Sequence, residues 1–124
     1  MTRKKPVNLA LTTIHFPMTA IVSILHRLSG VTLFLLVPCM LWMLDASLAN
    51  ATSFIRLMTI LQQPFPKFMV WVLLSAFTYH IAAGIRHLIM DAGYWESRKG
   101  GSRSASLLVI IVAVLIFVLG IWIW

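Results

Sequence analysis

Two short segments of the sequence carry polar and ionisable residues inside apolar stretches. The first is residues 23–30, which contains Ser23, His26, Arg27 and Ser29 ahead of Gly30. Because neighbours on a helix surface are three and four residues apart, all of these except Ser29 share one helical stripe. A guanidinium pairs with carboxylates, and serine or histidine can hydrogen-bond a carbonyl group. The stripe therefore suits a buried polar ligand, or the anionic propionate of a haem.

The same stripe also has a purely structural interpretation. A long side chain such as Arg27 can extend to the headgroups of the inner membrane surface while its stem stays in apolar surroundings. Ser23 and His26 would then hydrogen-bond the backbones of neighbouring helices. At 1.5 Å per residue, His26 lies only about 8 Å beyond Ile21, in the cytoplasmic part of the membrane. That depth suits a propionate contact better than an iron ligand.

The second segment, residues 80–91, places a further set of residues on one helical face: His80, Gly84, His87 and Asp91. A histidine inside a membrane either hydrogen-bonds a neighbouring helix or ligates a metal, since neutral imidazole is a good axial ligand of haem iron. His80 and His87 stand about 10 Å apart on the same side of one helix, so they cannot approach opposite faces of one haem. A second axial histidine would have to come from another chain.

The other residues of the second segment have simpler interpretations. Gly84 leaves space one turn from His80, which a flat macrocycle or a closely packed helix can occupy. Arg86 and Asp91 lie near the inner end of the helix. We expect these two residues to pair with each other or with solvent.

The composition defines the environment in which these residues act. The chain has 124 residues, of which 60% are hydrophobic and 10% charged, and this excludes a water-soluble enzyme. The net charge of +7 comes from residues in the N-terminal tail, at helix ends and in loops, so it indicates membrane topology rather than nucleic-acid binding. The single cysteine, Cys39, excludes an internal disulfide and a cysteine-ligated iron–sulfur cluster.

Three stretches are apolar over the roughly 20 residues that a bilayer core requires. They are residues 21–44, 65–90 and 105–124. The sequence thus predicts an all-α membrane protein with three transmembrane helices in one domain, residues 1–124. Residues 1–20 would form a cytoplasmic N-terminal segment.

Proline, glycine and serine predict the ends and bends of these helices. Pro38 is expected to kink the first, and Pro64 to lie in the first turn of the second, where its missing N–H is no loss. Residues 100–102, Gly-Gly-Ser, are expected to form a flexible turn before the third. Ser102 or Ser104 would then be the N-cap of that helix.

Lysine and arginine predict the orientation, because cytoplasmic loops carry an excess of them. Basic residues cluster at positions 3–5 and 98–103, whereas the first loop has only Arg56 and Lys67. The N-terminus is therefore expected inside and the C-terminus outside. Tryptophan and tyrosine, which favour membrane interfaces, predict the same topology: Trp42, Trp71, Trp122 and Trp124 outside, Tyr94 and Trp95 inside.

The location expected for the chain is a bacterial inner membrane. The basic N-terminus, the first apolar run and Ala49-Asn50-Ala51 imitate a secretory signal peptide with its cleavage site. The apolar run is too long for that interpretation, Arg27 lies within the helix, and two more spans follow. An Arg- and Ser-rich leader, typical of a mitochondrial precursor, is not seen.

The motifs resemble the cytochrome b subunit of bacterial succinate dehydrogenase, the larger of the two membrane anchors of that complex. The residues that carry the resemblance are Pro6-Val7-Asn8-Leu9, then Ser23, His26, Arg27, Ser29 and Gly30, and finally His80, Gly84-Ile85-Arg86-His87, Met90-Asp91 and Gly93. These motif regions, residues 5–30 and 80–93, cover about a third of the chain. Lys5 stands before Pro6 where the family usually has arginine, which keeps the charge but loses the guanidinium geometry.

The resemblance implies three transmembrane helices packed beside a second three-helix anchor, with a b-type haem between them. His80 is then similar to the axial ligand supplied by this chain, and His26 and Arg27 to the contacts of the haem propionates. Ser23 and Arg27 resemble residues that line the ubiquinone pocket, together with the iron–sulfur subunit and the small anchor. Asp91 matches an acid near the cytoplasmic mouth.

The resemblance also implies a reaction of the respiratory electron-transport chain and the tricarboxylic acid cycle that is distributed over four chains. Succinate is oxidised at the flavin of a soluble flavoprotein subunit, electrons pass along iron–sulfur clusters, and ubiquinone is reduced at the membrane. This chain would bind no succinate. Ser23 would hydrogen-bond a quinone carbonyl, and Arg27 would favour negative charge on the quinone and on a propionate.

Three other interpretations remain open at the level of the sequence. A fumarate reductase uses the same kind of anchor for the reverse reaction, and an anchor does not reveal the direction. A purely structural anchor would contain no haem. A small transporter is disfavoured, because the chain has no repeat symmetry and only Asp91 as an acid near the inner helix end.

Overall fold

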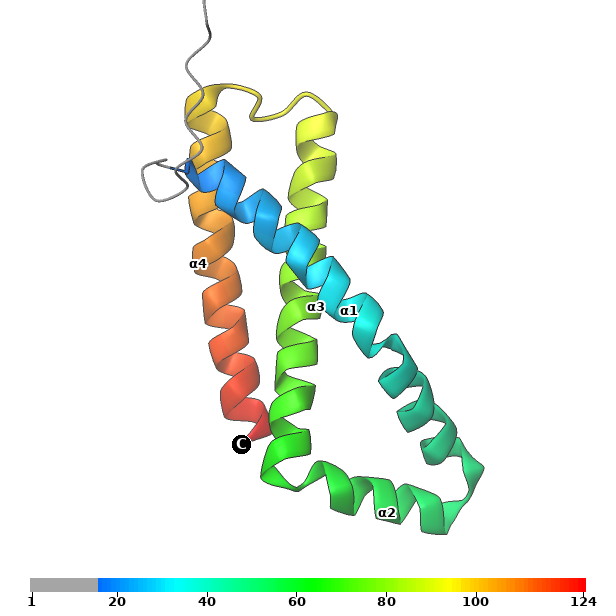
Figure 1. Ribbon diagram of the computed structural model, residues 1–124. Coiled ribbons are helices and arrows are strands. Elements are labelled where there is room, and N and C mark those ends of the chain that lie inside the picture. Colours follow the sequence, from blue (N-terminus) through cyan, green and yellow to red (C-terminus); the bar gives the residue numbers. More distant parts are fainter. Residues whose placement is uncertain (1–15) are drawn as a thin grey trace, which may run out of the picture.

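The computed structural model describes residues 16–124, which form four helices and no strand (Figure 1). The helices are α1 (Met18–Ala49), α2 (Ala51–Leu61), α3 (Pro64–Asp91) and α4 (Arg98–Ile123). Of these, α1, α3 and α4 are long and apolar enough to cross a membrane. The expected all-α class with three membrane spans is therefore confirmed. The basic residues 3–5 and the motif Pro6–Leu9 lie outside the described residues.

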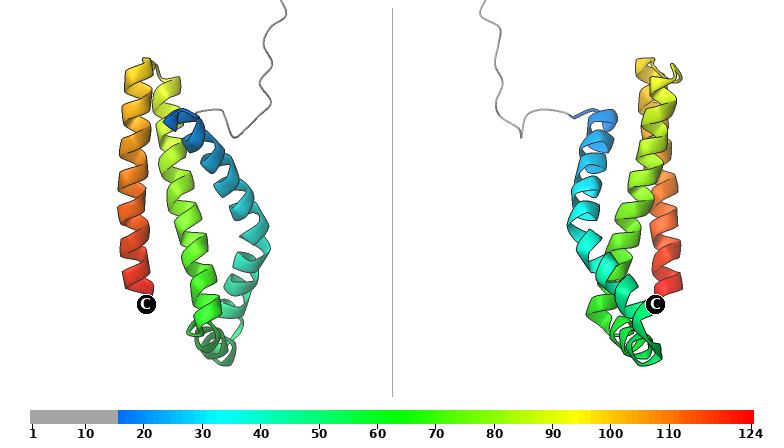
Figure 2. Two further views of the ribbon diagram at one scale, coloured as in Figure 1. Left: turned by 60° about the vertical axis from the view of Figure 1, so that its left-hand side comes forward. Right: turned by 90° about the vertical axis from the view of Figure 1, so that its right-hand side faces the viewer.

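The three long helices form an open bundle in which α3 is central (Figure 1). α4 runs beside α3 along most of its length, whereas α1 crosses α3 near the end where α3 and α4 are connected. α1 then diverges from α3, bends along its course, and is followed by α2, which lies across the opposite end of the bundle (Figure 2). The bend agrees with the kink expected from Pro38, which lies inside α1. The first residues of α1, the end of α3 and the start of α4 thus lie at the same end.

The short helix α2 was not expected from the sequence, which suggested only a loop between the first two spans. It begins because the side chain of Asn50 accepts a hydrogen bond from the backbone N–H of Ser53, at 2.9 Å. An N-cap of this kind satisfies one of the free amides of the first turn. α3 begins soon afterwards at Pro64, as the sequence predicts.

α4 begins earlier than the sequence predicts. Its N-cap is Ser97, whose hydroxyl accepts a hydrogen bond from the backbone N–H of Gly100 at 3.0 Å. The prediction of a flexible turn at residues 100–102, with Ser102 or Ser104 as the cap, was therefore wrong. Gly100 and Gly101 serve close packing instead: a Cβ added at Gly100 would lie 2.9 Å from the Ser97 hydroxyl, and Gly101 is buried near Thr19 of α1.

Small apolar residues fill the centre of the bundle. The buried core consists of Val22, Ala83, Ala105, Leu108 and Val112, which come from all three long helices. The two alanines, Ala83 of α3 and Ala105 of α4, are small enough to let helix backbones approach closely, which is how membrane helices associate. The larger apolar side chains mostly face outward. A chain with this distribution presents its apolar faces to lipid or to another membrane subunit.

Two aromatic side chains of α3 donate hydrogen bonds to backbone carbonyl groups of the neighbouring helices. The Tyr79 hydroxyl donates to the carbonyl oxygen of Val22 in α1 at 3.0 Å. Nε1 of Trp71 donates to the carbonyl oxygen of Ile116 in α4 at 3.2 Å. The two bonds lie about two helical turns apart along α3. They fix α3 against α1 on one side and against α4 on the other.

Arg86 connects α3 to the first turns of α4. This residue is only 4% exposed, and its Nε donates to Oγ of Ser104 at 3.0 Å. Its terminal NH2 group donates to the carbonyl oxygen of Gly101 at 2.9 Å. The expectation that Arg86 pairs with Asp91 or with solvent was therefore wrong. Arg86 turns inward between the helices, whereas Asp91 is exposed at the end of α3.

Replacing Ser104 by alanine should destabilise the protein, because Arg86 then keeps a buried donor without its acceptor. The expected cost is about 1–3 kcal/mol. Ser106→Ala is the matched control, since Ser106 Oγ also bonds a carbonyl of its own helix, that of Ser102, but has no bond to arginine. The unfolding midpoint of the purified, detergent-solubilised protein measures both effects. Equal shifts in the two variants would contradict the role given to the Arg86 contact.

Candidate functional site

Three histidines from two helices form a stack between α1 and α3. His26 of α1 lies between His80 and His87 of α3. Its ring centroid is 4.3 Å from that of His80, with an interplanar angle of 27°. The distance to the His87 ring is 5.1 Å, with an angle of 36°. The two histidine segments singled out in the sequence thus meet at one place, because α1 crosses α3 there (Figure 1).

His80 is held on one edge by two oxygen atoms of α1. Its Nδ1 lies 3.0 Å from Oγ of Ser29 and 3.2 Å from the carbonyl oxygen of His26. Ser29 is buried, and its hydroxyl donates to that same carbonyl oxygen at 2.8 Å. Nε2 of His80 makes no hydrogen bond with the described residues, whose contacts with this ring are all at Nδ1. This second nitrogen is the one left for a further partner.

Two glycines make room for the imidazoles of the opposite helix. A Cβ added to Gly30 of α1 would lie 3.0 Å from Cε1 of His80. A Cβ added to Gly84 of α3 would lie 3.6 Å from Nε2 of His26, which is an ordinary contact. Each helix thus offers a glycine where the other inserts a histidine. The sequence suggested that a flat macrocycle or a closely packed helix occupies the space at Gly84. Among the described residues, the neighbour is the packed helix α1, through the ring of His26.

His26 carries the unusual polar atom of this site. Its Nε2 is the one fully buried side-chain nitrogen or oxygen in residues 16–124 that has no hydrogen-bond partner. A buried polar group without a partner costs about 1–3 kcal/mol, so such atoms are uncommon and require an explanation. Because this chain itself encloses the atom, a group from another molecule satisfies it only after the packing around His26 changes.

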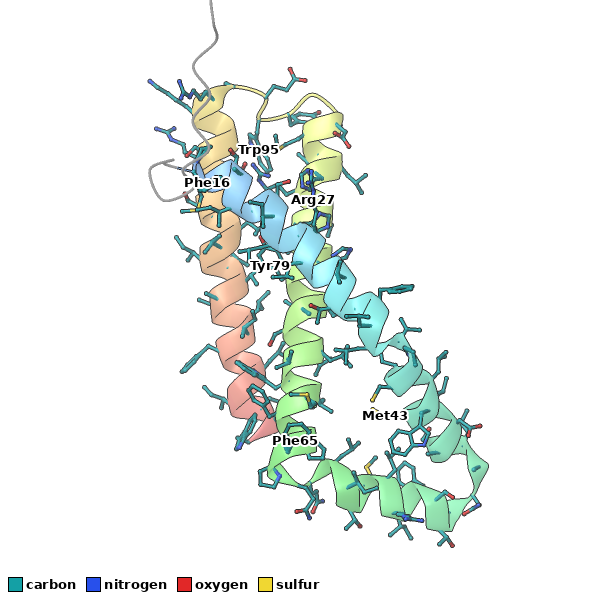
Figure 3. All side chains as sticks on the ribbon, viewed as in Figure 1. Phe16, Arg27, Met43, Phe65, Tyr79 and Trp95 are labelled. Carbon is teal, nitrogen blue, oxygen red and sulfur yellow. The ribbon has the colours of Figure 1, made fainter. Side chains whose placement is uncertain are left out.

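The remaining predicted site residues lie near the histidine stack on α1 or at the end of α3. Ser23 is half-buried and Arg27 is exposed, one helical turn apart on α1. Figure 3 shows Arg27 on the part of α1 that crosses α3, towards the end that carries Phe16 and Trp95. Asp91 is exposed at the last position of α3, on the same end of the bundle.

The histidines are not arranged as an ordinary protein metal site. In the part of the chain that the structure describes, no group of three or more His, Cys, Asp or Glu side chains could hold a metal ion. The reason is geometric, because stacked rings lie face to face and their nitrogen lone pairs do not converge on one point. A metal that brings its own equatorial ligands needs only one imidazole from this chain.

Comparison with known proteins identifies the family. Residues 1–121 match the family model described as succinate dehydrogenase/fumarate reductase transmembrane subunit. The chain belongs to this family. The match includes residues 1–15, which the structure does not describe, and it extends almost to the end of α4. The resemblance inferred from the two histidine motifs is therefore confirmed.

Three bacterial relatives of this transmembrane subunit carry the same name. The chain is 46% identical to the succinate dehydrogenase cytochrome b556 subunit of Coxiella burnetii, over 100% of both chains. It is 33% identical to the subunit of that name from Rickettsia prowazekii, over 77% of this chain and 74% of the relative. The protein from Paracoccus denitrificans is 27% identical, over 90% and 88%. The subunit is thus a multi-pass protein of the bacterial inner membrane, as the sequence predicts.

The donor atoms of the site fit the edge and one axial position of a haem. Nε2 of His80 has no hydrogen-bond partner among the described residues, and a neutral imidazole nitrogen is a common axial ligand of haem iron. Nε2 of His26 is enclosed by this chain, so a propionate contact at this donor requires the His26 ring to turn outward. The guanidinium of Arg27 is exposed on the same helix and is chemically suited to a carboxylate.

Sequence reasoning missed three features of the membrane subunit. It did not assign Ser29 a contact with His80, because Ser29 is off the stripe formed by the other polar residues of α1. It also did not reveal that the His26 ring packs against the tilted His87 ring or that Arg86 bonds to α4. Each of these contacts joins two helices. Spacing along one helix does not show which residue of another helix lies opposite. The one available signal was that each motif contains both a histidine and a glycine, and each glycine faces the histidine of the other motif.

Adding a methyl group at Gly30 should disturb the site more than adding one at Gly84. Gly30→Ala places its Cβ 3.0 Å from the His80 ring, which two oxygens of α1 hold in place, whereas Gly84→Ala makes a contact of 3.6 Å. We expect Gly30→Ala to cost about 1–3 kcal/mol through overpacking, with little effect from Gly84→Ala. Unfolding midpoints of the solubilised subunit would measure the difference. A larger loss in Gly84→Ala would contradict the packing described.

Proposed function

We propose that this chain is the cytochrome b membrane anchor of a succinate dehydrogenase, and that it supplies one axial haem ligand and part of the ubiquinone-reduction site. Membership of the family supports an anchor of this class. The observation that carries the finer proposal is His80, whose Nδ1 is held by α1 while its Nε2 has no hydrogen-bond partner among the described residues. An imidazole fixed on one edge and unpaired on the other is prepared for a ligand.

A b-type haem would be held at the α1–α3 contact. His80 would supply a ring nitrogen to the iron, and His26 and Arg27 would hold the propionates. Haem supplies one-electron redox chemistry when bound, and its properties depend on the ligand, on hydrogen bonds and on burial. The exposed guanidinium of Arg27 supports this arrangement, because it can pair with a propionate carboxylate.

The quinone site would use Ser23 and Arg27. The hydroxyl of Ser23 is half-buried one turn before Arg27 and can donate a hydrogen bond to a quinone carbonyl oxygen. The guanidinium of Arg27 would favour negative charge on the quinone as electrons arrive, which is an electrostatic contribution to its reduction. Asp91, exposed at the end of α3, would support this site or a path for protons.

The proposed partners follow from what this chain lacks. With one axial histidine used from α3, the second ligand comes from a small membrane anchor packed on the exposed apolar faces. A flavoprotein subunit and an iron–sulfur subunit dock at the end that holds the start of α1 and the α3–α4 turn. In this topology the N-terminus is cytoplasmic and the C-terminus is outside. The chain takes part in catalysis only within the complex and does not bind succinate.

The direction of the reaction is proposed from the relatives. The family model covers succinate dehydrogenase and fumarate reductase alike. The Coxiella and Rickettsia relatives above are both named as succinate dehydrogenase subunits, which favours succinate oxidation. A purified complex that reduces fumarate with quinol much faster than it oxidises succinate would reverse this assignment.

The haem proposal predicts that His80→Leu removes or shifts the b-type spectrum. The complex would be purified through a tag on this chain, and its dithionite-reduced minus oxidised visible spectrum recorded. Phe68→Leu is the control, because it changes an aromatic ring on the same helix about three turns from His80. We expect it to retain the α-band, since Phe68 lies outside the histidine stack.

Two results would contradict the haem proposal. An unchanged spectrum in His80→Leu would exclude His80 as the ligand. A wild-type complex that contains flavin and iron–sulfur clusters but no haem band would favour a haem-free structural anchor instead. If neither soluble subunit co-purified with the chain, the proposed partners would be wrong.

The quinone proposal predicts a separable loss of activity. Ser23→Ala and Arg27→Leu should lower succinate-to-ubiquinone turnover at least 10-fold, since removal of a donor to developing charge typically costs about 10²–10³-fold. Succinate oxidation with an artificial acceptor should be unchanged. Ser47→Ala and Arg56→Leu are the controls, as they lie at the opposite end of the bundle. An equal fall in both assays would contradict a quinone role.

A further inference from the structure

We propose that Ser29 is a positioning residue for His80: it accepts a hydrogen bond from Nδ1–H of that ring and thereby leaves Nε2 as the unprotonated nitrogen. This inference rests on the proposed role of His80 in haem binding and extends it to a residue outside the ligand set. Ser29 contacts no haem in this proposal. It acts through the imidazole alone.

The direction of the hydrogen bonds follows from three distances among three atoms. The carbonyl oxygen of His26 can only accept, and it lies 2.8 Å from Ser29 Oγ and 3.2 Å from His80 Nδ1. Ser29 therefore uses its single hydroxyl hydrogen on this carbonyl. The 3.0 Å contact between Ser29 Oγ and His80 Nδ1 must then be donated by the imidazole. Nδ1 faces two acceptors and carries the proton.

The opposite tautomer, with the proton on Nε2, would leave one of these three hydrogen bonds unmade. With Nδ1 unprotonated, its lone pair would face the lone pairs of the His26 carbonyl oxygen at 3.2 Å. Ser29 would have to choose between that oxygen and Nδ1 for its one hydrogen. Ser29 is only 7% exposed, so water has little access to compensate a lost bond. The folded chain thus fixes the tautomer before any ligand binds.

A ring nitrogen that donates to an oxygen makes the other nitrogen a better ligand. Such contacts fix the orientation of a metal-bound histidine and raise its basicity. A more basic ligand stabilises ferric over ferrous haem, which lowers the midpoint potential. Loss of the Ser29 acceptor should therefore raise the midpoint potential of the haem. The effect should be partial, because the His26 carbonyl oxygen remains as a second acceptor.

The test is a redox titration of the purified complex carrying Ser29→Ala, together with the low-spin ferric EPR spectrum. We expect a raised midpoint potential and a shifted gz value, with succinate oxidation by an artificial acceptor unchanged. Ser47→Ala is the matched control, because Ser47 Oγ also donates to the carbonyl three residues earlier in α1, at 2.7 Å, and touches no histidine. We expect both haem readouts of this control to match those of the wild type.

A second pair of variants separates the hydroxyl from the packing at this position. Ser29→Thr and Ser29→Val have nearly the same volume, but only threonine keeps an oxygen that can accept from Nδ1–H. We expect the threonine variant to have a lower midpoint potential than the valine variant and to retain more haem. This comparison decides the question even if Ser29→Ala fails to retain haem.

Three outcomes would overturn the inference. Wild-type potential and gz in Ser29→Ala would show that the hydroxyl does not act on the ligand. Equal properties of Ser29→Thr and Ser29→Val would show that volume alone matters. If the haem persists in wild type and disappears in His80→Leu, the proposed function stands even when Ser29 fails either test. A wild-type complex without haem would overturn both proposals.

Discussion

The structure depends on one constraint, namely that polar groups in the apolar part of a membrane must find their partners inside the protein. The contact between α1 and α3 is where this constraint acts most strongly. His80 reaches Ser29 and the His26 carbonyl, and Tyr79 reaches the carbonyl of Val22. These bonds fix where α1 crosses α3. The course of α1, the contact of Gly30 with the His80 ring and the two oxygens at His80 Nδ1 all follow from that crossing.

The same constraint distinguishes Arg86, which holds two helices together, from Arg27, which is available to a ligand. Arg86 is buried and its Nε and one terminal nitrogen have acceptors on α4, so its charge is used in holding two helices together. Arg27 is exposed on α1 beside the histidine stack. A cation inside a span is costly, and one that is not used for packing is a candidate for ligand binding. The residue type, arginine in both cases, did not reveal which of the two has the structural role.

Glycine and serine matter here through contacts rather than flexibility. Gly30 and Gly84 lie within helices and admit a ring from the opposite helix, while Gly101 lies within α4 and accepts Arg86 through its carbonyl. The expectation of a flexible Gly-Gly-Ser turn failed for this reason. In lipid, close approach of two backbones is a main source of helix association. A small residue therefore contributes more to stability inside a helix interface than in a loop.

The sequence by itself determined the class of protein, the three spans and the family. Hydrophobic length and residue spacing are local properties, and they suffice to predict a membrane helix and to recognise motifs such as Ser23–Gly30. The sequence also placed His80, Gly84 and His87 on one face of a helix. It could not predict α2, the N-cap Ser97 or the inward turn of Arg86. Those depend on competing local caps and on which helix lies opposite.

Only the tertiary structure decided which residues of α1 meet which residues of α3. His26 lies between two histidines of the other helix, and Ser29, outside the polar stripe, is the side chain that reaches His80. The crossing of two helices sets these pairs, and it depends on packing of both helices and of α4 at once. The physical reason is that the chain's covalent spacing fixes a residue's face within its own helix, whereas its partner is fixed by how separate helices pack.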